Sequence, residues 1–98
     1  MMAKRIDQGT DPEIMEALGR RLAALRAAAG LNQAEVAERA ALDRTTVSRA
    51  ERGDNPTLLT VVRLLRVYGR LPALDAFIPE PGVSPMALVR SRRGDADG

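Results

Sequence analysis

Arginine and hydroxyl side chains gather on one side of the segment from Arg44 to Arg52. If this segment is a helix, Val47 and Ala50 point inward, and the opposite face carries neither an acid nor a large apolar residue. A guanidinium can donate two hydrogen bonds to one guanine, and a threonine methyl can contact a thymine methyl. The pattern therefore predicts a face that contacts duplex DNA, and the alternative is an ordinary solvated charged face. The residues of the predicted face are Arg44, Thr45, Ser48, Arg49 and Arg52.

Start and stop signals of two helices precede this segment. Asp11, at the head of an apolar pattern with helical spacing, is expected to cap a first helix, which Gly30 ends. Asn32 is expected to cap a second helix at once, and Glu35 three residues later completes a capping box. The DNA-contacting segment is therefore expected to be the third helix in a series.

The third helix is expected to begin after Asp43, as its cap, and to end at Gly53. Only a few residues separate it from the second helix, so the stretch from Leu31 to Gly53 has the pattern of a helix-turn-helix. Such a unit places its second helix in the major groove of DNA while its first helix crosses the backbone.

Two further helices are expected to complete the fold. The fourth starts at Asn55 or Thr57 and runs to about Gly69, and the fifth covers 71–78 before two prolines. The expected core face of the fourth helix consists of Leu58, Val61, Val62, Leu65 and Tyr68. We predict an all-α, compact five-helix bundle at 11–78, with a flexible N-terminus at 1–10 and a mostly disordered tail at 79–98.

The composition argues against several function classes. The 98 residues include no cysteine and no histidine, so thiolate chemistry, the usual zinc ligands and the commonest general base are missing. We therefore expect no enzyme activity, no catalytic residue, no metal and no cofactor. The formal net charge of +2 supports a polyanionic partner only mildly. No run reaches the roughly 18 apolar residues of a membrane span, so we expect a cytoplasmic protein with no membrane partner.

Several short motifs occur together between about residues 14 and 69. They are Leu18, Leu22, Leu25 and Arg26, then Leu31-Asn32-Gln33-Ala34-Glu35, Val36-Ala37, Val47 to Gly53 with its closing Glu51-Arg52-Gly53, and Asn55-Pro56-Thr57-Leu58. In this combination the chain resembles the helix-turn-helix family of phage repressors and Cro proteins, the XRE type. The resemblance implies a lambda-repressor-like fold and a DNA-binding transcription regulator.

The resemblance also implies roles for individual residues. Gln33 matches a glutamine that contacts a phosphate or a nearby base, and Arg44, Thr45, Ser48 and Arg49 match base-reading positions. Arg26 and Glu51 match an ion pair that ties the first helix to the third, the alternative being two unpaired surface charges. Ala41 stands where the family often has glycine, and a left-handed backbone there would cost alanine about 1 kcal/mol.

Apolar side chains outside the expected core face predict a homodimer. A lone domain of this size should not leave so many of them in water, so a twofold interface is expected. The dimer would present two recognition helices about 34 Å apart to a near-palindromic operator. The predicted interface residues are Leu64, Val67, Leu71, Leu74, Phe77 and Ile78.

These expectations favour a sequence-specific DNA-binding regulator, a dimeric repressor, over three alternatives. The first is an antitoxin that neutralises a partner toxin, through 79–98, and represses its own operon. The second is a controller of restriction–modification genes, and the third is a protein-interaction adaptor that does not bind DNA. The tail contains three arginines, Arg90, Arg92 and Arg93. Three interpretations stay open for them: a solvated end, an arm that contacts DNA, or a segment that orders on a partner.

Overall fold

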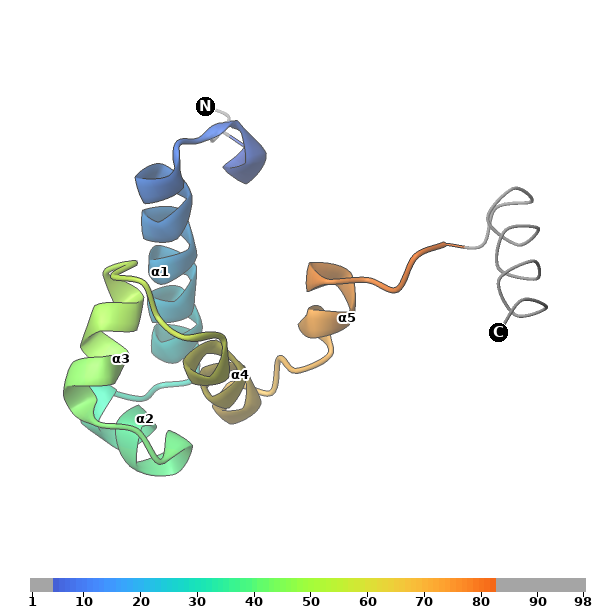
Figure 1. Cartoon of the computed structure of the whole chain (residues 1–98). Helices are drawn as coiled ribbons and strands as arrows, with labels where there is room; N and C mark the ends of the chain where they lie inside the picture. Colours follow the sequence, from blue (N-terminus) through green and yellow to red (C-terminus); the bar gives the residue numbers. More distant parts are fainter. Residues whose placement is uncertain (1–4, 83–98) are drawn as a thin grey trace.

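A computed structural model describes residues 5–82 as a chain of helices without strands (Figure 1). A short 3-10 turn, η1, precedes five α-helices. They are η1 (Ile6–Gln8), α1 (Asp11–Ala28), α2 (Gln33–Ala40), α3 (Arg44–Glu51), α4 (Leu58–Val67) and α5 (Ala73–Phe77). The predicted all-α class is confirmed. Of the N-terminus expected to be flexible at 1–10, residues 1–4 lie outside the described residues, and 5–10 contain η1. Of the tail expected to be disordered at 79–98, residues 83–98 lie outside the described residues.

Helix α1 begins at Asp11, the residue expected to be its N-cap. Thr10, not Asp11, is the N-cap: its hydroxyl accepts a hydrogen bond from the Glu13 amide at 3.4 Å. The Thr10 amide in turn donates to the Glu13 carboxylate at 2.9 Å, which closes a capping box. Asp11 instead occupies the first helical position, where its charge faces the positive end of the helix dipole.

The helix-turn-helix is formed by α2, a tight turn and α3. The predicted capping box of Asn32 and Glu35 is present, with reciprocal hydrogen bonds of 2.8 and 2.9 Å. Ala41 ends α2 in the left-handed conformation, at φ 56° and ψ 45°, so alanine bears there the strain that glycine would avoid. Asp43 occupies the cap position of α3, but its side chain makes no capping hydrogen bond.

The hydrophobic core lies where α1, α2, α3 and α4 meet. Its members are Leu22, Val36, Ala37, Ala40, Val47, Ala50 and Leu64. Small residues on α2 and α3 let these helices approach closely. Gly19 on α1 has the same effect: a Cβ added there would lie 2.5 Å from the Glu51 carbonyl oxygen and 2.7 Å from the Gly53 nitrogen. The core thus fixes α3 against α1 as well as against α2.

The buried face of α4 differs from the expected one. Leu64 is fully buried in the core, so its prediction as a dimer-interface residue is wrong, and Val67 also packs against the core. Thr60 is buried too, and its polar groups are paired with Thr57, the cap of α4. The Thr60 amide donates to the Thr57 hydroxyl, and that hydroxyl donates to the hydroxyl of Thr60. Leu65 and Tyr68 of the expected face do pack against the core, whereas Leu58 is 55% exposed instead of facing it.

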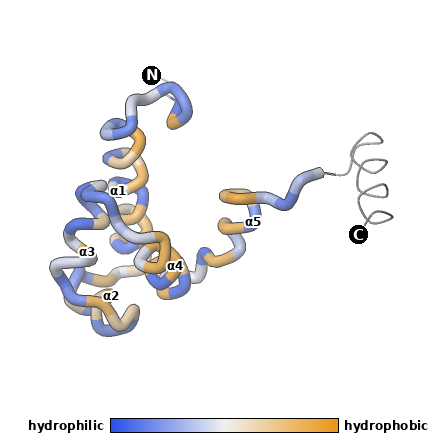
Figure 2. The backbone as a smooth tube through the Cα atoms, viewed as in Figure 1, coloured by the Kyte–Doolittle hydropathy of each residue, from blue (hydrophilic) through white to orange (hydrophobic). Residues whose placement is uncertain are grey.

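The last helix, α5, stands apart from the other four (Figure 1). It is shorter than expected, because the observed helix covers only Ala73–Phe77 of the predicted 71–78. Figure 2 shows hydrophobic residues along it, and Phe77 and Ile78 are 55% and 68% exposed. Within residues 5–82, no helix is long and apolar enough to cross a membrane.

Candidate nucleic-acid interface

The outward face of α3 is free of the protein's own helices. Val47 and Ala50 anchor the opposite face in the core with no exposed surface. Arg44, Thr45 and Arg49 are exposed, and their side chains make no hydrogen bond or ion pair within the described residues. The guanidinium groups of α3 are therefore available to an external acceptor such as a phosphate or a base edge.

The other two residues of the predicted face interact with each other. Arg52 Nη1 donates a 2.7 Å hydrogen bond to Ser48 Oγ, one helical turn earlier. Ser48 is half-buried and Arg52 is exposed. Because the bond occupies one of five guanidinium donors, it orients Arg52 along the helix and leaves most of its donors unused.

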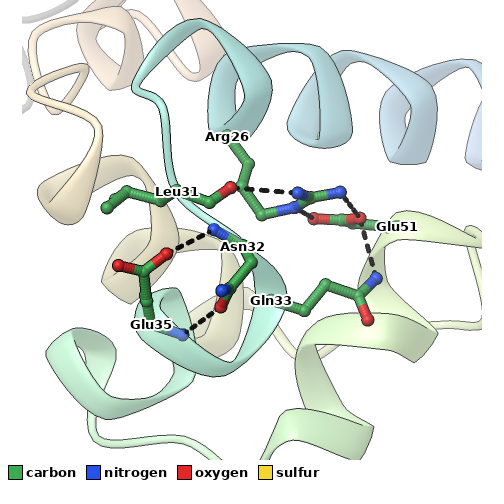
Figure 3. A network of polar contacts seen from close by, with 6 residues as sticks. All are labelled: Arg26, Leu31, Asn32, Gln33, Glu35 and Glu51. Atoms are coloured by element: carbon green, nitrogen blue, oxygen red, sulfur yellow. Dashed lines mark hydrogen bonds and ion pairs between the residues drawn. The ribbon is translucent and has the colours of Figure 1, made fainter.

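An ion pair joins the end of α3 to α1 (Figure 3). Arg26 Nε donates to Glu51 Oε2 at 2.6 Å, and Arg26 Nη2 donates to Glu51 Oε1 at 3.0 Å. Arg26 Nη1 donates to the Leu31 carbonyl at 3.0 Å, so the guanidinium also holds the chain that enters α2. Arg26 and Glu51 thus form the pair that the sequence predicts, and it is a bidentate one.

Gln33 extends this pair into α2. Its Nε2 donates to Glu51 Oε1 at 3.0 Å, so a single carboxylate holds side chains from α1 and α2 (Figure 3). The amide nitrogen has a second hydrogen, which can still donate to an external acceptor. The sequence did not predict this bond, because the spacing of residues 33 and 51 corresponds to no local pattern.

The electrostatics keep both members of the ion pair charged. Burial raises the pKa of the Glu51 carboxyl. Hydrogen bonds from Arg26 and Gln33, together with the charge of Arg26, lower the pKa by more than burial raises it, so the net pKa lies below its usual range. The hydrogen bond to Glu51 raises the pKa of Arg26. Burial, followed by the Glu51 charge, raises the pKa of the nearby Tyr68 phenol to about 12. A charged Glu51 therefore fixes the relative positions of α1, α2 and α3 at neutral pH.

The predicted dimer residues do not form one surface. Leu64 belongs to the core, and the half-buried Val67 packs against it. Leu71 and Leu74 are half-buried, and Phe77 and Ile78 are exposed. The remaining candidates therefore lie on α5 and directly before and after it.

The match with a known family covers most of this architecture. Residues 17–77 match a protein family described as a helix-turn-helix domain, a span from within α1 to the end of α5. No curated protein and no solved structure matches the chain.

Proposed function

Because the chain belongs to the helix-turn-helix domain family, whose members are XRE-like regulators, we propose that it reads a DNA sequence with the outward face of α3. The observation that carries this proposal is the free face of α3. Arg44, Thr45 and Arg49 are exposed and unpaired there, while Val47 and Ala50 lock the other face into the core. A row of exposed guanidinium and hydroxyl groups on a helix that is fixed in the core suits direct readout in the major groove.

In this proposal Gln33 and Arg52 contact the sugar–phosphate backbone and set the register of α3. Gln33 is held by Glu51 and retains one amide hydrogen for a phosphate oxygen. Arg52 is held by Ser48 at the end of α3. These contacts add affinity without sequence information, and each neutralised phosphate makes binding more sensitive to salt.

We further propose that the protein is a homodimer and acts as a repressor. The apolar residues of α5 and of its C-cap, of which Phe77 and Ile78 are the most exposed, support a second copy as partner. Two copies related by a twofold axis would present two α3 helices to half-sites one DNA turn apart. A dimer seated on a near-palindromic operator would exclude other proteins from that DNA.

Selection of bound DNA from a random pool tests the proposal. We expect a near-palindromic motif for the wild type, and Arg49→Ala should lose one base preference in each half-site. Its specific binding should weaken by about 1–3 kcal/mol, or roughly 5- to 150-fold. A matched control is Arg20→Ala, which removes an exposed arginine on α1 and should leave the motif unchanged. An Arg49→Ala motif identical to that of the wild type would refute the assignment.

A further inference from the structure

A second concave surface lies between α2 and α4. This groove, which we call the arginine groove, has a volume of about 420 Å³. Its lining consists of guanidinium groups, which we call the rim, and of apolar side chains, which we call the floor. The residues that line it are Arg39, Ala40, Ala41, Arg63, Arg66 and Val67. The lining combines a threefold positive charge with aliphatic contacts, and it belongs to neither α3 nor the network around Glu51.

The positive charges of the arginine groove have no acidic partner within residues 5–82. The side chains of Arg39 and Arg66 are exposed and make no hydrogen bond or ion pair among the described residues. Arg63 donates only to a backbone group, the Ala41 carbonyl, at 3.3 Å. No acid occurs along α4 to oppose them. Guanidinium groups bind planar carboxylates in bidentate fashion, so the groove suits an acidic segment that also brings apolar side chains.

The described chain itself contains a segment of that chemistry, the arm formed by α5 and the residues just after it. Asp75 and Glu80 are exposed acids on this arm, and no basic residue lies between Ala73 and Glu80. Phe77 and Ile78 supply exposed apolar surface. Gly69, at φ +68°, ends α4 in a left-handed turn, and α5 then stands away from the other helices of its own copy (Figure 1).

We propose that α5 of one copy docks in the arginine groove of a second copy. The acids Asp75 and Glu80 pair with Arg39 and Arg66, and the apolar side chains of the arm cover the floor at Val67. Two copies that exchange arms in this way close a twofold dimer with no groove left empty. The inference rests on the homodimer of the proposed function and deepens it, because it names the surface that receives each arm.

Charge reversal tests this pairing. One variant reverses the groove, with Arg39→Glu and Arg66→Glu, and a second reverses the arm, with Asp75→Arg and Glu80→Arg. Arg63 stays, because it bonds the turn at Ala41. In each variant the groove and the arm carry like charges, so each should dimerise at least tenfold more weakly than the wild type in sedimentation equilibrium.

The two reversed variants are then mixed in equal amounts. In a mixed dimer both groove–arm contacts join opposite charges, so the mixture should regain the dimer within about threefold of the wild-type dissociation constant. Raising the salt concentration should weaken the mixed dimer, because its rim charges are screened. Arg20→Glu, a reversal on α1, is the matched control and should dimerise like the wild type.

Three outcomes would overturn the inference. They are a wild type that stays monomeric, reversed variants that dimerise as tightly as the control, and a mixture of the two variants that stays monomeric. The last would indicate that the arm and the groove do not pair with each other, and that the groove binds a different acidic partner. Binding to a single DNA half-site, measured in parallel, reports on α3 alone. A monomer that still binds the half-site therefore overturns arm exchange and leaves DNA reading by α3 in place.

Discussion

Replacing Arg26 by methionine is the sharpest test of how α3 is held in place. The substitution keeps most of the side-chain volume but removes the partner of Glu51, whose side chain is only 7% exposed. Breaking a buried ion pair from one side costs roughly 3–5 kcal/mol, because the remaining charge is left without its counterion. Gln33 still donates one hydrogen bond to that carboxylate, so we expect the lower end, about 3 kcal/mol.

The reverse substitution should cost less. Glu51→Gln leaves Arg26, whose side chain is 21% exposed and accessible to water, and the new amide oxygen can still accept a hydrogen bond. We expect a loss of about 1–2 kcal/mol. The double variant Arg26→Met with Glu51→Met should be more stable than Arg26→Met alone, since no buried charge remains unpaired.

The pH dependence gives a second signature of the same pair. The folded-state pKa of Glu51 lies below its unfolded value, so the pair stabilises the protein fully above about pH 4.5. That contribution is lost as the pH falls through the folded-state pKa. Without Arg26, burial should raise the pKa of Glu51, so the cost of Arg26→Met should be larger at pH 7 than at about pH 3.5.

Urea unfolding followed by circular dichroism measures these differences. Arg20→Met, an exposed arginine on α1, is the control and should change stability by less than about 0.5 kcal/mol. A double variant less stable than Arg26→Met, or a cost of Arg26→Met that does not change between pH 7 and pH 3.5, would refute the reasoning.

Three further substitutions test the packing around α3, each by urea unfolding. Gly19→Ala should destabilise the fold by at least about 1–3 kcal/mol, since its Cβ would meet the backbone at Glu51 and Gly53, whereas Gly82→Ala, which meets no atom within 4 Å, should be neutral. Ala41→Gly should stabilise the fold by about 1 kcal/mol through relief of the left-handed strain, and a loss of stability would contradict that origin. Tyr68→Phe removes a buried hydroxyl without a hydrogen-bond partner among the described residues, so it should be neutral or stabilising by about 1 kcal/mol. Burial raises the pKa of Tyr68 to about 12, so the unfolded chain loses the phenol proton at a lower pH than the folded protein does. The stability of the wild type should therefore fall as the pH rises from about 10 toward 12, and the phenylalanine variant should lack that alkaline loss.

The elements of the helix-turn-helix could be predicted from the sequence because their signals are local. Asn32 and Glu35 lie three residues apart and cap α2 through short-range bonds that any chain context would permit. The inward face of α3 could also be predicted, because Val47 and Ala50 differ plainly in polarity from their neighbours. The family resemblance supplied the pairing of Arg26 with Glu51.

The rest depended on tertiary structure. The buried face of α4 was misassigned because Thr60 counts as polar in a periodicity analysis, whereas Thr57 satisfies its hydroxyl in the fold. Leu64 follows Thr60 by four residues and so lies on the same side of α4, and it is buried in the core instead of in a dimer interface. The bond from Gln33 to Glu51 and the convergence of Arg39 with Arg63 and Arg66 likewise require α2 to be placed beside α3 and α4.

The central claim is that arginines on α3 touch base edges, and coupling between one side chain and one base tests it most directly. Each guanine of the selected site is replaced in turn by 7-deazaguanine, which lacks the N7 acceptor, and the affinity is measured for the wild type and for Arg44→Ala and Arg49→Ala. We predict that the wild type loses affinity at a defined guanine and that one of the variants is insensitive there, with a coupling of about 1–3 kcal/mol. Equal losses for the wild type and both variants at every guanine would contradict readout by α3.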